Sequence, residues 1–298
     1  MRADQKSDSR DKKKEIHLIT FDDPEYPLLL KEIKDPPKTL YYIGRKELLQ
    51  TRCAAVIGSR TTTAYGRNTA RAIARCLAEN GITVVSGMAS GIDSCAHEGA
   101  LEVGGKTIAV LGTGPDLCYP SSNWELKAAI EARGLVLSEF PPGTQAMPYH
   151  FPMRNRIISG LSELTVVVQA RVRSGALITA ELAAEQGREV LAVPGNIDSM
   201  YNLGSNQLIR EGISPVTTIE NVLEPFGLDG RRRDDAAAGL GGMERQVYQA
   251  LSEQGEMSTD ELCLLLDCSP GYLLPILSAL ELKGLITSAM GKFFLAKP

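Results

Sequence analysis

Six short apolar runs recur between residues 53 and 227, separated by turn-forming residues and by segments with helical periodicity. In order they are AAVIGS, ITVVSG, TIAVLG, LVLSE, LTVVVQA and EVLAVPG. Continuous apolar strands that alternate with helices indicate a parallel sheet covered by helices on both faces. The pattern therefore predicts an α/β fold over residues 53–227, a doubly wound, Rossmann-like parallel sheet.

The flanking segments have different patterns. Residues 1–14 are charged and have no apolar surface to offset their ordering entropy, so we expect a disordered tail. Residues 15–52 are apolar but interrupted by two adjacent prolines, which predicts a lead-in that packs on the core. The polar, glycine-rich residues 228–242 predict a linker. Residues 243–298 show three helical periods and a hairpin, which indicates a small winged-helix domain.

Composition narrows the class of protein. The 298 residues are 43% apolar and 23% charged, with a formal net charge of −4, so nucleic-acid binding would need a local basic patch. The six cysteines form no C-x-x-C pair, which indicates reduced thiols and no zinc or other metal site. The N-terminus lacks an apolar core and no apolar run is long enough to span a bilayer. We therefore expect a cytoplasmic protein.

The first predicted strand ends in Gly58, Ser59 and Arg60. Ligands of such sheets bind at the carboxyl ends of the strands, where all the loops discussed next are placed. Glycine lets the backbone approach a ligand, serine offers a hydroxyl, and arginine matches phosphate bidentately. The loop lacks the G-x-G-x-x-G spacing of a dinucleotide fold and the lysine of a P-loop, so neither NAD nor ATP is assigned. An ordinary turn with a solvent-exposed arginine remains the alternative.

Two further glycine-rich loops follow the second and third strands. Ser86, Gly87 and Gly91 belong to SGMASGID, which leads into a helix, an arrangement whose backbone N–H groups can bind an anion. Gly112 and Gly114 follow the third strand, where simple turn chemistry is an equal alternative.

Asp93 and His97 lie one turn apart on the helix that follows SGMASGID. The spacing would suit an acid/base pair. Because Asp93 also suits a helix N-cap and an isolated histidine is more often structural, the structural role is favoured and no catalytic residue is assigned.

The segment FPMRNRIISG places Arg154, Asn155 and Arg156 where an apolar helical period begins. A helix N-terminus already favours anions, so added arginines concentrate positive potential and suit a phosphate backbone. An internal ion pair with Glu139 or Glu163 is the alternative. Arg173, Ser174 and Gly175 follow the fifth strand and extend the same edge, so a row of phosphates fits the positions better than one phosphate.

These motifs resemble those of the DNA-processing protein A family (DprA, also called Smf), bacterial recombination mediators. The resemblance covers residues 26–227 through YP…DPP, IGSR, SGMASGID..AH, LGTGPDLCYP, LSEFPPGT…HFPMRNRIISGLS, RSGALITAELAAEQGRE and VPG. As an ordered set the motifs are highly specific. The linker and small C-terminal winged helix are also similar to that family's layout.

The resemblance implies a protein that binds single-stranded DNA without sequence preference and helps to load the RecA recombinase during natural transformation. It also implies a homodimer formed through the Rossmann-like domains, no cofactor and no catalysed reaction. The family's phosphate-contacting arginine corresponds to Arg60, and its RNR motif corresponds to Arg154, Asn155 and Arg156.

The chain departs from the family at three places. Ser90 stands where the family commonly has arginine, which removes one anion contact. Only a short lead-in precedes the Rossmann-like part, where many members have a helical domain. Pro275 falls inside the expected recognition helix, which should start late or kink there. That helix is also poor in basic residues, so a protein contact or positioning role is favoured over duplex binding.

Two other functions compete with DNA binding. A small-nucleotide-binding or nucleotide-hydrolysing protein related to the phosphoribohydrolases would share the fold, but the P-G-G-x-G-T-x-x-E loop of those enzymes is missing. An NAD-dependent oxidoreductase would need the dinucleotide fingerprint and an acidic residue for the ribose, and neither is present.

Overall fold

The structure is a computed structural model that describes residues 15–228, 240–289 and 291–296. The chain divides into two compact units, residues 1–228 and 229–298, and each is described by itself. The tail expected at residues 1–14 lies outside the described residues, as do residues 229–239 of the expected linker.

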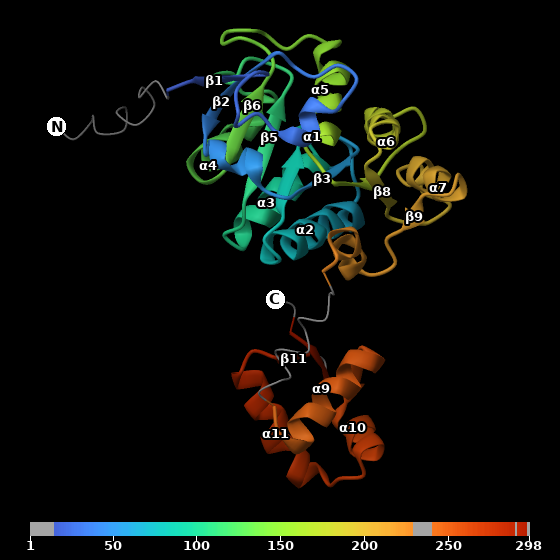
Figure 1. The fold of residues 1–298 in the computed structure, drawn as a ribbon. Coiled ribbons are helices and arrows are strands. Elements are labelled where there is room, and N and C mark those ends of the chain that lie inside the picture. Colours follow the sequence, from blue (N-terminus) through green and yellow to red (C-terminus); the bar gives the residue numbers. More distant parts are fainter. Residues whose placement is uncertain (1–14, 229–239, 290, 297–298) are drawn as a thin grey trace, which may run out of the picture. The chain divides into compact units, whose positions relative to one another are not determined.

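The first unit is built on a nine-stranded sheet with the order β1-β2-β6-β5-β4-β3-β7-β8-β9 (Figure 1). All neighbours from β6 to β9 are parallel, as the six apolar runs predicted. The strands are β1 (His17–Thr20), β2 (Thr39–Gly44), β3 (Cys53–Gly58), β4 (Thr83–Ser86), β5 (Thr107–Leu111), β6 (Leu135–Ser138), β7 (Leu164–Gln169), β8 (Glu189–Ala192) and β9 (Ser214–Pro215).

Helices cover both faces of this sheet, which confirms the doubly wound class. One face holds α2 (Ala64–Glu79), α3 (Ile92–Glu102), α4 (Trp124–Arg133) and the 3-10 helix η3 (Ile219–Phe226). The other holds α1 (Leu28–Lys31), α5 (His150–Gly160), α6 (Gly175–Glu185) and α7 (Leu203–Arg210). The short 3-10 helices η1 (Lys46–Gln50) and η2 (Ser121–Asn123) lie in connections. Each face of the parallel strands is therefore buried, which explains why their sequences are apolar without alternation.

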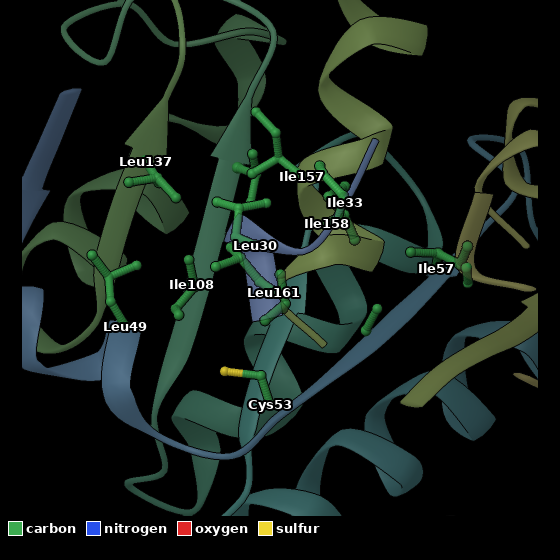
Figure 2. Packing of buried hydrophobic residues seen from close by; sticks show 14 of the residues in the cluster. Leu30, Ile33, Leu49, Cys53, Ile57, Ile108, Leu137, Ile157, Ile158 and Leu161 are labelled. Atoms are coloured by element: carbon green, nitrogen blue, oxygen red, sulfur yellow. The ribbon is translucent and has the colours of Figure 1, made fainter. Parts of the chain in front are cut away.

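The lead-in does more than pack on the core. Its strands β1 and β2 join the sheet in antiparallel orientation next to β6, an extension that the sequence did not predict. Its helix α1 lies on α5, where Leu30 and Ile33 pack against Ile157, Ile158 and Leu161 (Figure 2). All five side chains are buried, so the lead-in helps to fix the position of α5.

The strand order reverses beside β3. Strands β4, β5 and β6 follow on one side of β3, whereas β7 and β8 lie on the other. The connections that leave the carboxyl ends of β3 and β7 therefore diverge, one toward α2 and the other toward α6. In open α/β sheets such a switch point is where ligands bind.

The described residues of the second unit form three helices and a three-stranded sheet of order β10-β12-β11. Its elements are α9 (Gly242–Gln254), β10 (Glu256–Ser258), α10 (Thr259–Leu266), α11 (Pro270–Leu282), β11 (Ile286–Ala289) and β12 (Lys292–Leu295). This is the expected winged helix, with one more strand than the predicted hairpin. Leu240, which falls in the expected linker, is buried in the core of this unit.

The expected recognition helix is α11. It begins at Pro270 and continues through Pro275, its sixth residue, so of the two outcomes expected from this proline, a late start or a kink, the late start does not occur. No single helix in the described residues is long and apolar enough to cross a membrane; α10 and α11 meet that criterion only as a pair bent by 112°.

Candidate nucleic-acid interface

A groove lies at the carboxyl ends of the central strands, between α5, α6 and the loops after β3, β4 and β5. Its empty volume is about 1240 Å³ with the open side included. Of the residues that the sequence singled out, those that line it or the small adjoining pocket are Gly58, Ser59, Arg60, Gly87, Gly112, Arg154, Asn155, Ser174 and Gly175. We call the groove and this adjoining pocket together the carboxyl-edge groove.

The β3 loop is held in place by Gln169 at the end of β7. The backbone N–H of Ser59 donates to the carbonyl oxygen of Gln169 at 2.8 Å, and the Gln169 side chain accepts from the hydroxyl of Thr62 at 2.6 Å. Gln169 is fully buried, so these bonds fix the start of the connection to α2. Arg60, which follows Ser59, is exposed and lines the groove.

Arg60 lies beside an aromatic pair in the groove. Its guanidinium lies 5.0 Å from the ring centroid of Phe151, and Phe151 lies 5.4 Å from the ring of Tyr119. Tyr119 is exposed, and both rings line the groove. A cation beside a pair of aromatic rings can bind a phosphate while a base stacks on the exposed face of a ring.

The loop after β4 needs its glycines. A Cβ atom on Gly87 would collide with the guanidinium of Arg154, and Gly91, with φ +86°, would place a Cβ 2.6 Å from the carbonyl oxygen of Arg60. Between them Met88 has φ 55°, a conformation that is rare for a bulky side chain. Such strain is concentrated at functional sites in proteins, so it supports a functional loop here.

Arg154 forms the floor of the groove. It is 4% exposed, and its Nη1 donates to the carbonyl oxygen of Gly87 at 2.8 Å and to that of Val110. Burial lowers the pKa of Arg154 to about 10, while the nearby carboxylate of Asp93 opposes this change. The guanidinium remains charged at neutral pH, but its hydrogen bonds go largely to the ends of β4 and β5.

Asp93 and His97 are both buried, and their contacts indicate structural rather than catalytic roles. Asp93 is buried and accepts from the backbone N–H of Ala89 at 3.4 Å, and Gly91 occupies the N-cap position. Burial raises the pKa of Asp93, and Arg154 opposes that shift. His97 is fully buried with its Nδ1 2.7 Å from the Thr107 hydroxyl, and burial lowers its pKa to about 3. A neutral, inaccessible imidazole has no route to a substrate.

The three residues of RNR point in different directions because α5 turns by about 100° per residue. Asn155 Nδ2 donates to the carbonyl oxygen of Gly175 at 3.4 Å, which ties α5 to α6. Arg156 binds both carboxylate oxygens of Glu139, at 2.6 and 2.7 Å, and lies 3.3 Å from Asp35 in the lead-in. Arg156 does not line the groove, and the ion pair weighed as its alternative is present.

Helix α5 begins earlier than the sequence suggested. It starts at His150, so Arg154 lies in its second turn and neither arginine of RNR occupies the helix N-terminus. The prediction that positive charge is concentrated at a helix N-terminus is therefore wrong. Arg154 lines the groove from the second turn of α5 instead.

The start of α6 opens into the groove. Ser174 is its N-cap residue, makes no side-chain capping bond, and its Oγ has no hydrogen-bond partner among the described residues. A Cβ on Gly175 would meet nothing within 4 Å, so the backbone there is accessible. Arg173 is exposed with φ 63°, but it does not line the groove. The N-terminus of a helix favours an anion, and the start of α6 faces the groove at this point.

The remaining predicted residues support the loops. Ser86 is fully buried and donates to the carbonyl oxygen of Val56 at 2.7 Å. Gly112 lies beneath the ring of Phe151. Gly114 donates its N–H to the carbonyl oxygen of Thr144 at 2.8 Å and does not line the groove. Ser86 and Gly114 thus stabilise the loops at the carboxyl edge of the sheet without lining the groove.

Sequence reasoning missed Phe151 and Gln169. Phe151 lies three residues before Arg154, and aromatic residues interleaved with arginines are a recognised signal of nucleic-acid binding. Gln169 ends an otherwise apolar buried run, LTVVVQ, and a polar residue at that point of a strand indicates a hydrogen-bonding role at the carboxyl edge.

Both units of the chain match models of known families. Residues 17–227 match the family model described as DNA recombination-mediator protein A, and residues 231–292 match the DprA winged helix domain. The chain is 47% identical over 201 residues to the DNA processing protein DprA of Streptococcus pneumoniae, a match that spans 67% of this chain and 71% of that protein.

Solved structures similar to this one include two of DNA processing protein A. The X-ray structure of DNA processing protein A from Streptococcus pneumoniae has a TM-score of 0.68 at 45% identity, over 72% of this chain and 74% of that one. The structure of DNA processing protein A from Helicobacter pylori, which concerns that protein's single-stranded DNA binding mode, has a TM-score of 0.64 at 32% identity. That match covers 70% of this chain and 95% of the other.

Proposed function

The chain belongs to the DNA recombination-mediator protein A family, and on that basis we propose that it binds single-stranded DNA, without sequence preference, in the carboxyl-edge groove. The observation that carries the proposal is the guanidinium of the exposed Arg60 over the ring of Phe151, which in turn contacts the ring of Tyr119. Stacking on aromatic rings and cationic contacts to the backbone are the two terms that bind single strands irrespective of sequence.

The charge of the groove supports a polyanion as its ligand. Two arginines, Arg60 and Arg154, line it with one carboxyl group, Asp93, which is buried at the floor. The accessible cation is Arg60, and the N-terminus of α6 adds partial positive charge. A phosphate that bridges Arg60 and α6 would lie across the groove, with neighbouring phosphates along its open side.

Further elements of the proposal follow from the family. The protein would act as a mediator in the cytoplasm during natural transformation, load the RecA recombinase onto DNA and form a homodimer through its Rossmann-like unit. It would hold no cofactor and catalyse no reaction. The burial of His97, together with the hydrogen-bonded state of Asp93, supports a binding site rather than a catalytic site.

The proposal is tested by titrating a labelled oligothymidylate at several salt concentrations. Each phosphate contact in a single strand contributes about 0.7 to the slope of log affinity against log salt. Arg60→Ala should weaken binding and reduce this slope by about that amount. Arg133→Ala is the matched control, because Arg133 is exposed at the end of α4, next to the amino end of β6.

Arg154→Ala is a poor test of the same contact because it removes a buried group on which the fold depends. The proposal fails if Arg60→Ala and Arg133→Ala give the same affinity and the same salt slope. Titration with AMP in parallel addresses the small-nucleotide alternative: AMP that competed with the oligonucleotide at equal concentration would favour that alternative.

A further inference from the structure

Gln169, the last residue of β7, binds the chain on both sides of Arg60. Its backbone carbonyl oxygen accepts from the N–H of Ser59 at 2.8 Å. Its side-chain Oε1 accepts from the hydroxyl of Thr62 at 2.6 Å and from the backbone N–H of Thr63 at 3.1 Å. Only Arg60 and the residue after it lie between these two anchors, so the backbone of Arg60 has little conformational freedom.

The orientation of the Gln169 amide follows from its neighbours. A backbone N–H group can only donate, so the atom that faces the N–H of Thr63 is the oxygen. The amide nitrogen Nε2 then donates to the Thr63 hydroxyl at 3.0 Å and to Oδ1 of Asn202 at 2.7 Å. Gln169 is fully buried and Asn202 is 4% exposed, so these bonds lie out of reach of bulk water. A buried polar network in which both ends of an amide are engaged is rigid.

The space around this amide is closed by two glycines. A Cβ atom on Gly66, in the first turn of α2, would lie 2.0 Å from Oε1 of Gln169. A Cβ atom on Gly195, in the connection after β8, would lie 2.0 Å from Nδ2 of Asn202. The connections that follow β3 and β8 therefore both pack closely on the network at the end of β7.

Gln169 itself does not line the carboxyl-edge groove, whereas Arg60 does. Any effect of Gln169 on a ligand in the groove must therefore pass through the residues that it holds. A cationic residue whose backbone is fixed before the ligand arrives loses less conformational entropy on binding, and this raises affinity.

We propose that Gln169 is a positioning residue for single-stranded DNA: it holds the backbone of Arg60 so that the guanidinium meets a phosphate, without touching the DNA itself. The inference rests on the proposed function, in which Arg60 is the accessible cation of the groove. Gln169 therefore raises the affinity for a single strand only while Arg60 is present. A residue that merely stabilised the fold would not show this dependence.

A double-mutant cycle measures that dependence. Gln169→Met keeps the length of the side chain and removes its hydrogen bonds. In the wild-type background it should weaken oligothymidylate binding by about three- to tenfold, the range typical when an ordered group becomes mobile. In the Arg60→Ala background it should change the affinity by less than about twofold.

Gln186→Met is the matched control for the same substitution. Nε2 of Gln186 donates to the carbonyl oxygen of Arg156 at 3.2 Å, which joins the end of α6 to α5, and Gln186 does not line the groove. This variant should leave the affinity unchanged in both backgrounds.

Amide hydrogen exchange of the free chain tests the same contact without DNA. In Gln169→Met the segment 59–66 should exchange faster than in wild type, because the N–H of Thr63 loses its acceptor. Thermal unfolding shows whether the variant is folded. If it is not, Thr62→Val removes one donor and leaves the amide in place, and it should show the same dependence on Arg60 with a smaller loss of affinity.

The inference is overturned if the two substitutions of the cycle act additively, or if exchange over residues 59–66 is unchanged. Its failure can be told from failure of the proposed function by Arg60→Ala alone. Additive effects with a weakened Arg60→Ala overturn the positioning role and leave the DNA site standing. An Arg60→Ala variant that binds as tightly as wild type overturns both.

Discussion

Gly87 and Arg154 form a matched pair: the guanidinium of Arg154 donates to the carbonyl oxygen of Gly87 at 2.8 Å, in the space that a Cβ atom on residue 87 would fill. The loop after β4 and the side of α5 are thereby locked together. The floor of the groove depends on this contact, because Arg154 also caps the carbonyl oxygen of Val110 at the end of β5.

Replacing Gly87 should therefore damage both fold and binding. In Gly87→Ala the methyl group displaces the Arg154 guanidinium and leaves buried carbonyl groups without a donor, which should lower the free energy of unfolding by about 3 kcal/mol. Chemical denaturation measures this change. Gly175→Ala is the control and should stay within about 0.5 kcal/mol of wild type, because its methyl group meets nothing. Equal stability of the two variants would contradict the locked contact.

Arg156 should behave as an anchor of α5 and not as a DNA contact. In Arg156→Ala the ion pair with Glu139 is lost, and we expect a loss of about 2 kcal/mol in unfolding free energy with an unchanged salt slope for oligothymidylate binding. The double variant Arg156→Glu with Glu139→Arg exchanges the two charges, so it should recover part of the unfolding free energy that Arg156→Ala loses. A salt slope reduced to the same extent as in Arg60→Ala would show instead that Arg156 reaches the phosphates.

Phe151 should supply stacking without charge. Phe151→Ala should reduce the affinity for oligothymidylate by about 1–3 kcal/mol, the amount typical of one stacked base, while the salt slope stays constant. Phe151→Tyr keeps an aromatic face and should bind almost as tightly as wild type. Fluorescence anisotropy at two or more salt concentrations separates the two effects. Loss of affinity in both variants would indicate that the residue acts through packing alone.

His97 should make stability depend on pH. Its pKa is lowered from an ordinary value near 6.5 to about 3 in the folded chain, so the unfolded chain binds a proton that the folded chain excludes. Stability is therefore lost as pH falls through 6.5, by about 2 kcal/mol between pH 7 and pH 5. His97→Gln should remove this slope. Taking the difference between wild type and variant cancels the opposite contribution of Asp93, and a difference that does not change with pH would contradict the burial of a neutral imidazole.

The central strands could be predicted because β3 to β8 are buried on both faces, so that their apolar runs stand out from the helical segments around them. Strands β1 and β2 were not predicted, since they lie at and near the edge of the sheet, are partly exposed, and are separated by a segment that contains four prolines. Strand β9 has only two residues, one of them a proline, and offers no periodicity.

The loops of the site were easier to predict than the directions of their side chains. Glycines after β3, β4 and β5 indicated the edge itself, and most of the residues chosen there line the groove. Arg154 and Arg156 have the same chemistry two positions apart, yet about 200° of helical rotation sends one to the floor of the groove and the other to Glu139. That outcome depends on how α5 packs against α1 and the sheet, which no local pattern contains.

The most direct measurement is a crystal structure of the chain with a short oligothymidylate. The account predicts a phosphate between the guanidinium of Arg60 and the first turn of α6, with a base stacked on Phe151 or Tyr119. Phosphates bound on another surface, with the carboxyl-edge groove unchanged and Arg60 still facing solvent, would contradict it.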